Sequence, residues 1–293
     1  MPIAAFRVLL IVLLTWPFAT AATAGASQAH LDDPLVNEIL PRPISALTGS
    51  AFAGSLTAKD DATREAAILT QLMKGNLPDF LRTLKPVRLI DRSASGKKTT
   101  ATLFVMPDYL AIGSDGDFLR VPMRLSTATE IATRFHFVLP TKKIVDAIFA
   151  QADLRLAPEP LPPGPEMRST EYFLQHNRMI EVQRQAMGGP LGGLIAGQKK
   201  DLVLTNRLTR QAGRLAIYGW HRPTGIPIQP LSTVHGARYA DYSHGIRLVS
   251  DTMLIDGEPH SVFAVLEDPR LAQLVSDEGP IRDTRGLITT PHP

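Results

Sequence analysis

Imidazoles, a carboxylate and a hydroxyl gather in residues 220–244, and these side chains are the best suited in the chain to do chemistry. The candidate catalytic residues are His221, His235, Asp241, Ser243 and His244. The candidate substrate-binding residues are Trp220, Tyr239, Tyr242, Lys199 and Lys200. Imidazoles, carboxylates and aromatic rings on loops and strand ends commonly form sites for small molecules or glycans. We therefore expect the functional site in this stretch.

Two chemistries fit these residues. In the first, His221, His235, Asp241 and His244 bind a zinc ion that activates water. In the second, no metal takes part and His244 acts as general acid or base, with Asp241 or His235 orienting it and a hydroxyl or water as nucleophile. Zinc is therefore a possible cofactor, and none is certain.

The backbone around His244 separates the alternatives. If residues 239–248 form one regular strand, Asp241 and His244 point to opposite faces and do not act together. A bulge at Tyr242 and Ser243, or a strand that starts only at Gly245, brings them onto one side. The sequence leaves both arrangements open.

Non-catalytic roles are the alternative. Trp220, Tyr239 and Tyr242 form the platform of a glycan- or peptide-binding module in one version. In the other, the histidines and tyrosines only join loops by hydrogen bonds. Lys199 and Lys200 are expected at a solvated strand entry, with an anion site as the alternative. Two histidines outside this stretch, His136 and His176, are expected on helix or loop surfaces.

The C-terminal half is expected to hold a helix followed by a mostly antiparallel sheet. Helix 169–187 begins at an N-cap, Ser169 or Thr170. Strands are predicted over 201–205, 213–220, 226–230, 239–250, 252–256 and 260–266, with a closing helix from 268 to about 275. Asp256 and Gly257 form the strongest hairpin signal in the chain.

The N-terminal half reads as helices with a β-hairpin, so the fold class is α+β. The helical pattern of residues 60–84 is broken at 75–78, and helices are also expected over 126–135 and 141–152, with Thr141 as N-cap. Residues 99–110 are expected to pair with 118–123 through a turn at 114–117.

Five prolines in residues 157–165 mark a connector, because proline fixes φ and removes a backbone donor. The expected organisation is a leader (1–26), an N-terminal subdomain (33–156), the connector, a C-terminal subdomain (166–278) and a tail (279–293). The alternative is that the connector is a strap lying across a single domain.

The first residues have the pattern of a secretory signal peptide. Arg7 precedes a mostly apolar run over 8–18, and small residues then favour cleavage after Ala24 or Ala26. No later apolar run reaches the roughly 20 residues that span a membrane. The chain has no cysteine, which excludes disulfides, thiolate ligands and a cysteine nucleophile. We expect an exported protein, periplasmic or extracellular.

The formal net charge of +3 is spread along the chain, and paired lysines lack interleaved aromatic residues, so nucleic acid is not an expected partner. An envelope or extracellular glycan or peptide is expected instead. The sequence does not indicate an oligomeric state.

Two resemblances bear on function, and a third supports only a bacterial source and export. Ser243-His244-Gly245-Ile246-Arg247-Leu248 resembles the histidine-bearing strand of NlpC/P60-type peptidoglycan peptidases, and Asp201-Leu202-Val203-Leu204 resembles the strand before it. That family uses a cysteine at a helix start, where this chain has only the hydroxyl residues Ser169 and Thr170. Residues 75–82, 106–115 and 239–248 together resemble an uncharacterised family of exported bacterial proteins.

His235 and Asp241 are similar in spacing to the ligands of metal-dependent D-Ala-D-Ala peptidases, which have a glutamate and a Trp-His pair further downstream. Here Trp220-His221 lies upstream. The leading expectation is an exported hydrolase of the cell envelope or of an extracellular polymer, similar to a peptidoglycan peptidase or amidase. The alternative is a non-catalytic glycan- or peptide-binding protein.

Overall fold

The computed structural model describes residues 39–56, 59–92 and 98–284. The expected leader and residues 285–293 of the expected tail lie outside these ranges. The residues from Asp33 onward form one compact unit. Within the described part, no helix combines the length and the apolar character needed to cross a membrane.

The helices follow local signals. Asp60, Thr141 and Ser169 each cap a helix by accepting a hydrogen bond from a backbone N–H in its first turn, which confirms the caps expected at Thr141 and Ser169. The α-helices are α1 (Gly49–Ser55), α2 (Asp61–Met73), α3 (Leu125–Arg134), α4 (Lys142–Gln151), α5 (Thr170–Ala186) and α6 (Val262–Glu267). Short 3-10 helices are η3 (Asp79–Arg82), η4 (Pro165–Arg168), η5 (Asn206–Arg210) and η6 (Ala272–Leu274).

The larger sheet has the order β14-β13-β2-β12-β5, with β1 also pairing with β2. Its strands are β1 (Lys85–Arg92), β2 (Lys98–Val105), β5 (Phe137–Val138), β12 (Val249–Ser250), β13 (Thr252–Ile255) and β14 (Glu258–Ser261). Strands from both sides of residues 157–165 thus belong to one sheet, where the sequence analysis divides the chain into two subdomains.

The smaller sheet has the order β10-β9-β8-β11 and carries most of the candidate site. Its strands are β8 (Lys200–Leu202), β9 (Ile217–His221), β10 (Pro227–Ser232) and β11 (His244–Gly245), and β11 alone pairs in parallel. Two further strand pairs are β3 (Ala111–Ser114) with β4 (Asp117–Arg120), and β6 (Leu154–Arg155) with β7 (Ile195–Ala196). With six α-helices and these sheets, the described chain is an α+β fold, as the sequence predicts.

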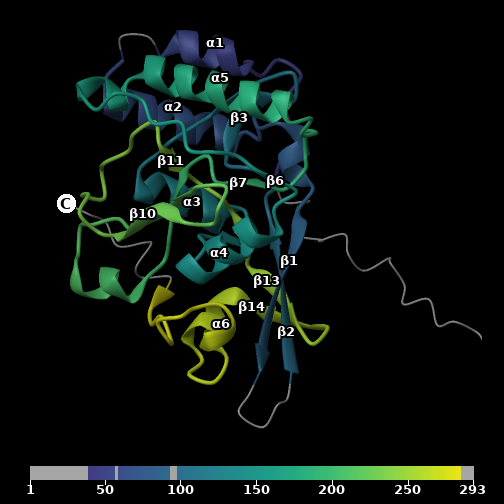
Figure 1. The fold of residues 1–293 in the computed structure, drawn as a ribbon. Coiled ribbons are helices and arrows are strands. Elements are labelled where there is room, and N and C mark those ends of the chain that lie inside the picture. Colours follow the sequence, from purple (N-terminus) through teal and green to yellow (C-terminus); the bar gives the residue numbers. More distant parts are fainter. Residues whose placement is uncertain (1–38, 57–58, 93–97, 285–293) are drawn as a thin grey trace, which may run out of the picture. The chain divides into compact units, whose positions relative to one another are not determined.

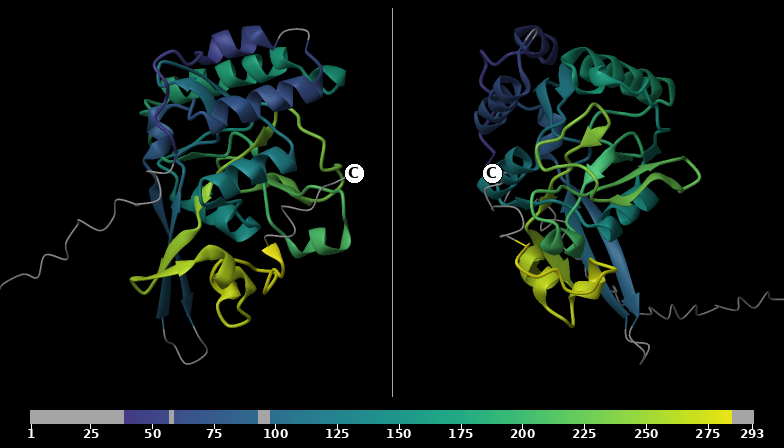
Figure 2. Two further views of the ribbon diagram at one scale, coloured as in Figure 1. Left: turned by 180° about the vertical axis from the view of Figure 1, so that it is seen from behind. Right: turned by 90° about the vertical axis from the view of Figure 1, so that its left-hand side faces the viewer.

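The helices α1, α2 and α5 lie together beside the β3–β4 hairpin (Figures 1 and 2). Helix α4 packs against β9 and β1, and α3 packs against β5. One large apolar cluster includes residues of both halves, such as Leu103, Phe173, Leu202 and Val249. The site is therefore held by a core that is continuous across the expected boundary.

Residues 157–165 lie across α5 and the start of the candidate site. Ala157 N–H donates to Gln183 of α5, and Leu161 N–H donates to the Tyr242 hydroxyl. With these contacts, residues 157–165 lie against α5 and the loop before β11, as in the alternative expectation of a strap across a single domain.

Four expected elements differ from the structure. Of the closing helix expected from 268 to about 275, only the 3-10 helix η6 is present. The partner of β2 is β1, and the turn at 114–117 joins β3 to β4 instead. Residues 262–266 are helical in α6, because four apolar side chains, Val262, Phe263, Val265 and Leu266, are buried on a helix of six residues. Residues 239–250 hold only the two short strands β11 and β12. The hairpin at Asp256 and Gly257 is confirmed, with φ of 51° and 96°.

Candidate functional site

The start of β11 brings Asp241 and His244 to one side of the backbone. Asp241 Oδ1 accepts the N–H of Ser243 at 2.8 Å, and the His244 N–H donates to the Asp241 carbonyl at 3.0 Å. This side-chain turn ends before the strand begins at His244, so the strict alternation expected from a strand over 239–248 does not apply. Asp241 Oδ2 lies 4.0 Å from His244 Nε2.

Gly245 keeps this turn in place against β8. A Cβ on Gly245 would lie 2.5 Å from Cδ1 of Tyr109 and 2.9 Å from Cβ of Lys199, so only glycine fits the contact. The Tyr109 hydroxyl in turn donates to Asp201 of β8 at 2.9 Å. The close approach of β11 to β8 therefore depends on the absence of a side chain at 245.

The His244 imidazole is fully buried, and neither of its ring nitrogens makes a hydrogen bond. Burial lowers the pKa of His244 below its usual 6.5, the attraction of Asp241 opposes this, and Lys200 and His235 add to the lowering. The ring is therefore neutral at neutral pH, with a free lone pair. A buried polar group without a partner costs about 1–3 kcal/mol.

The Asp241 carboxylate is engaged by hydroxyl and amide donors. Oδ1 also accepts the Ser243 hydroxyl at 2.6 Å, and Oδ2 accepts the Tyr239 hydroxyl at 2.9 Å. Burial raises the pKa of Asp241, but His244, Ser243 and Lys200 outweigh burial and hold the pKa below 3.8. Because the Ser243 hydroxyl donates to Asp241, it is not aligned as a nucleophile with His244 as its base.

Two half-buried rings cover His244. His235 and Tyr239 stack with centroids 4.2 Å apart and an interplanar angle of 7°, and their centroids lie 5.9 and 5.6 Å from that of His244. Both side chains are partly exposed, whereas His244 is not. His235 and Tyr239 are therefore the partly exposed rings that lie next to the buried His244 ring.

The adjacent lysines differ in their surroundings. The partly exposed Lys200 ammonium lies 4.9 Å from the centroid of the Trp220 ring, and burial lowers its pKa while Asp241 opposes that effect. Lys199 is buried, donates to the Tyr242 carbonyl at 2.5 Å, and has a pKa lowered to about 7 by burial and by Arg120. The solvated strand entry expected for both residues is wrong for Lys199.

His221 belongs to a different cluster. Its Nε2 lies 3.0 Å from Asp146 Oδ1, which also accepts the Tyr218 hydroxyl at 2.7 Å, and its ring stacks on Phe149 with centroids 4.6 Å apart. These residues line a surface pocket of about 420 Å³. Gly219, with φ of 108°, and Trp220, with φ of 52°, interrupt the alternation of β9 and let Tyr218 and His221 meet the same carboxylate.

The four expected metal ligands therefore do not converge. His221 bonds Asp146, whereas Asp241 and His235 lie next to His244. Within residues 39–284, apart from the undescribed gaps, no three histidine, aspartate or glutamate side chains are arranged to hold a metal ion.

The expected aromatic platform is mostly internal. Trp220 is 5% exposed and Tyr242 is 1% exposed, and the two rings pack edge to face against each other. His176, expected on the surface, is fully buried beside both rings. Of the three expected platform residues, only Tyr239 is partly exposed.

Sequence reasoning missed Asp146 and Tyr218, which pair with His221. Asp146 lies 75 positions away from His221, and no local pattern joins them. Comparison with known proteins adds nothing to this geometry, because no family model, curated protein or solved structure matches the chain.

Proposed function

We propose that this protein is a hydrolase in which His244 is the general base and the Asp241 carboxylate stabilises its protonated form. The supporting observation is the His244 ring itself, which is fully buried, lacks a hydrogen bond on either nitrogen, and stands beside Asp241 and the charge of Lys200. The combination of an unpaired buried base with a carboxylate neighbour is typical of catalytic sites.

In the proposed reaction, His244 accepts a proton from water while the water oxygen attacks a carbonyl carbon of the substrate. The imidazolium then gives this proton to the leaving amine as the carbon–nitrogen bond breaks. Asp241 stabilises the imidazolium, and the Lys200 ammonium stabilises the developing oxyanion. Water is the nucleophile because the Ser243 hydroxyl donates to Asp241. The His235 and Tyr239 rings move apart to admit substrate.

The proposed substrate is a polymer outside the cytoplasm, with the amide bonds of peptidoglycan as the first to be tested. The N-terminal pattern of Arg7 and residues 8–26 supports an exported protein. The similarity of residues 243–248 to the histidine strand of envelope peptidases supports the amide bond.

The test is release of soluble fragments from purified peptidoglycan, followed by mass spectrometry, for the wild type, His244→Gln and His176→Gln. His176 is the matched control, since its ring is also fully buried but packs against Trp220 and Tyr242 and is paired with no carboxylate of the described residues. General-base catalysis contributes about 10²- to 10⁴-fold, so His244→Gln is expected to lose at least about 10²-fold and His176→Gln to keep its rate. Equal rates for all three proteins would refute the proposal, as would a wild type that releases nothing.

A further inference from the structure

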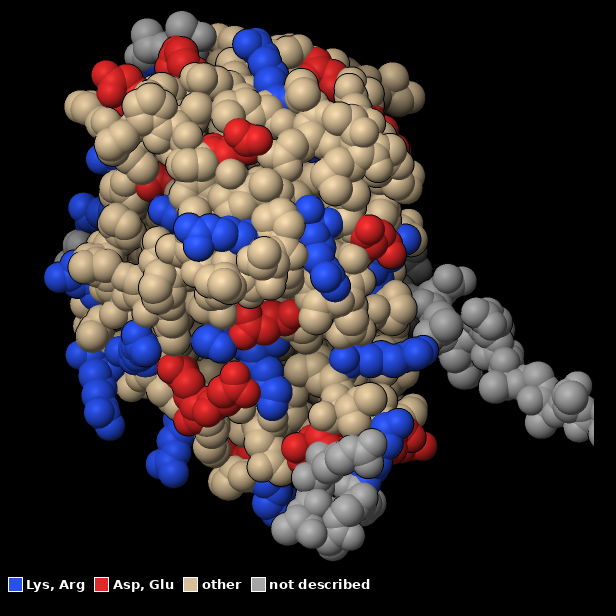
Figure 3. Space-filling model, in the orientation of Figure 1, with Lys and Arg blue, Asp and Glu red and all other residues tan. Residues whose placement is uncertain are grey.

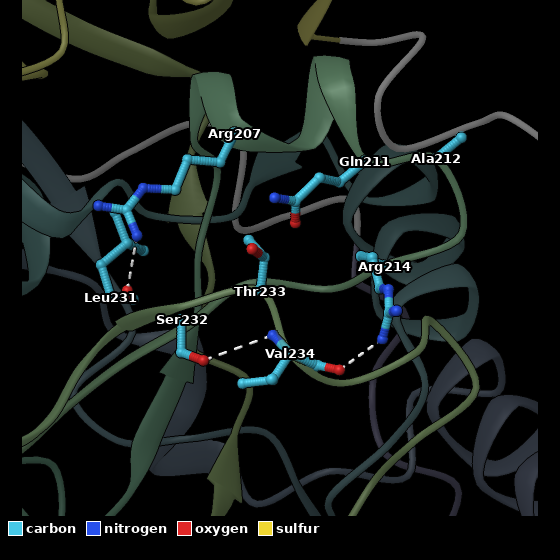
Figure 4. Close-up of a pocket in the computed structure, with 8 residues that line it drawn as sticks. All are labelled: Arg207, Gln211, Ala212, Arg214, Leu231, Ser232, Thr233 and Val234. Atoms are coloured by element: carbon cyan, nitrogen blue, oxygen red, sulfur yellow. Dashed lines mark hydrogen bonds between the residues drawn. The ribbon is translucent and has the colours of Figure 1, made fainter.

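A surface hollow lies between η5 and the end of β10. Residues 231–234, which directly precede His235, form one of its walls. Its volume is about 550 Å³. Figure 4 shows Arg207 and Arg214 at opposite edges, each turned toward a backbone carbonyl of residues 231–234, with Gln211 and Thr233 pointing toward the space between them. Two cations therefore flank a wall that carries an amide and a hydroxyl.

The two arginines are held in position by the backbone. Arg207 Nη1 donates to the Leu231 carbonyl at 2.8 Å, and Arg214 Nη1 donates to the Val234 carbonyl at 2.5 Å. One N–H of each guanidinium is used in this way, and each group has five donors. Among the described acids, Glu278 lies 4.0 Å from Arg207 Nε, and it is already bound by Thr205. Pre-positioned guanidinium groups are suited to bidentate binding of carboxylate or phosphate.

The segment of sequence that supplies the lining of the hollow has an excess of positive charge, and Arg207 and Arg214 are its two basic residues that line the hollow. Residues 202–240 contain no aspartate or glutamate and hold Arg207, Arg210, Arg214, Arg222 and Arg238. The whole chain, in contrast, is nearly balanced, with 31 lysines and arginines and 28 acidic residues. Basic side chains are visible along the left margin of the surface, where β10 lies in Figure 1 (Figure 3). A single-sign charge of this kind attracts anions to the hollow.

The hollow is linked to the His244 site through one short segment. The hollow is lined by Ser232, Thr233 and Val234. The next residue is His235, whose ring centroid lies 5.9 Å from that of His244. The Leu215 N–H donates to the His235 carbonyl at 3.1 Å, and Arg214 forms a β-bridge with Gly236. A ligand in the hollow therefore contacts the same stretch of backbone that carries His235.

We propose that this hollow is a subsite for an oxyanion, a carboxylate or a phosphate, carried on a glycan, with Arg207 and Arg214 holding the charge. Gln211, Ser232 and Thr233 provide hydrogen bonds to sugar hydroxyls. The further statement that the glycan belongs to the substrate of His244 rests on the proposed function. The substrate class is then an acidic glycan or glycopeptide.

The test is titration calorimetry with two pairs of probes, oligogalacturonate against its methyl ester, and phosphorylated against dephosphorylated mannan oligosaccharides. The first pair reports carboxylate binding and the second reports phosphate binding. Binding of either anionic probe in preference to its neutral partner supports the subsite and identifies the anion. Equal binding of the charged and neutral members of both pairs, or no binding at all, overturns it.

Variants locate the binding. Arg214→Gln and Arg207→Gln are each expected to raise the dissociation constant of the anionic probe by about tenfold or more. Each substitution removes a charge-assisted hydrogen bond from the protein to the anion. Arg210→Gln is the matched control, because Arg210 is an exposed residue of η5 that does not line the hollow. Equal losses in all three variants would show attraction by diffuse charge and overturn the subsite.

His244→Gln separates this inference from the proposed function. It is expected to leave the dissociation constant of the anionic probe unchanged. A protein that binds the anionic probe through Arg207 and Arg214 but hydrolyses no substrate supports the subsite and contradicts the hydrolase.

Discussion

The histidines of two histidine–aspartate pairs lie on the same small sheet, and the pairs differ in how fully their hydrogen bonds are satisfied. His221 bonds Asp146 at 3.0 Å, and this carboxylate also accepts Tyr218 and Lys142. His244 Nε2 and Asp241 Oδ2 are 4.0 Å apart, and the His244 ring nitrogens have no partner although the ring is fully buried. The pair with the shorter distance is thus the more complete one.

The difference indicates different roles. A complete network of histidine, tyrosine and lysine around one carboxylate stabilises the contact of α4 with β9. The unpartnered imidazole of His244 makes no such contribution, and folding alone does not explain why it is buried 4.0 Å from the Asp241 carboxylate. We therefore assign stability to His221 and chemistry to His244, and substitutions in both pairs and next to them test that division.

The largest expected effect is on turnover. Asp241→Asn removes the negative charge that stabilises the protonated His244, so kcat/KM is expected to fall by about 10²- to 10³-fold. Asp146→Asn removes the corresponding charge from the other pair and is expected to keep kcat/KM within about threefold, since it does not contact the reacting groups. Steady-state kinetics on a common substrate measure both, and equal losses would abolish the distinction between the pairs.

The next expected effect is on stability and has the opposite order. His221→Leu loses the bond to Asp146 and leaves that carboxylate one donor short, so the free energy of unfolding is expected to fall by about 2–4 kcal/mol. His244→Leu breaks no hydrogen bond of the ring and removes a buried polar group without a partner, so the free energy of unfolding is expected to stay equal or to rise by up to about 3 kcal/mol. Urea titrations compare the two, and a larger loss for His244→Leu would contradict the account.

A smaller effect concerns the pH dependence of folding stability, which the buried His176 ring is expected to influence. Burial, with Lys199 and Arg120, lowers the pKa of His176 from 6.5 to about 2. Below pH 6.5 the unfolded chain therefore binds a proton that the folded chain does not, and folding stability falls as pH falls toward 2. The expected slope is about 1.4 kcal/mol per pH unit for this one group. His176→Leu should remove that slope between pH 6 and 5 in urea titrations, and an unchanged slope would show that the ring is protonated in the folded state.

The smallest expected effect is at Ser243. Its hydroxyl donates to Asp241, so Ser243→Ala removes one hydrogen bond of about 1 kcal/mol and is expected to lower kcat/KM by less than about tenfold. Loss of a nucleophile would reduce turnover by several orders of magnitude. Such a loss in Ser243→Ala would identify the serine, which the sequence analysis included among the catalytic residues, as the attacking group.

The parts of the fold that are encoded locally were predictable. Helices α2, α4 and α5 begin at residues that cap them, and the Asp256–Gly257 turn has the positive φ angles that its residue types favour. The pairing of β1 with β2 was not predicted. The turn signal that follows residues 98–110, at 114–117, joins β3 to β4 and says nothing about the partner of β2. For residues 262–266, a short apolar run fits a buried strand and a buried helix equally well.

The candidate site was predicted in part. Grouping by sequence was correct for His235, Asp241, Ser243 and His244, which lie on one loop and strand start. An aspartate two residues before Ser243 is a local signal for the turn that ends the expected strand. Sequence proximity failed for His221, whose partner Asp146 comes from α4. It also failed for Trp220 and Tyr242, whose burial depends on α5 and the strap.

The most direct test of the account is kcat/KM for the wild type, His221→Gln and His244→Gln on one peptidoglycan substrate, each corrected for its folded fraction. The account predicts that His221→Gln stays within about threefold of the wild type, while His244→Gln falls by at least about 10²-fold. The reverse order would place the chemistry at His221 and Asp146 and contradict the assignment of His244.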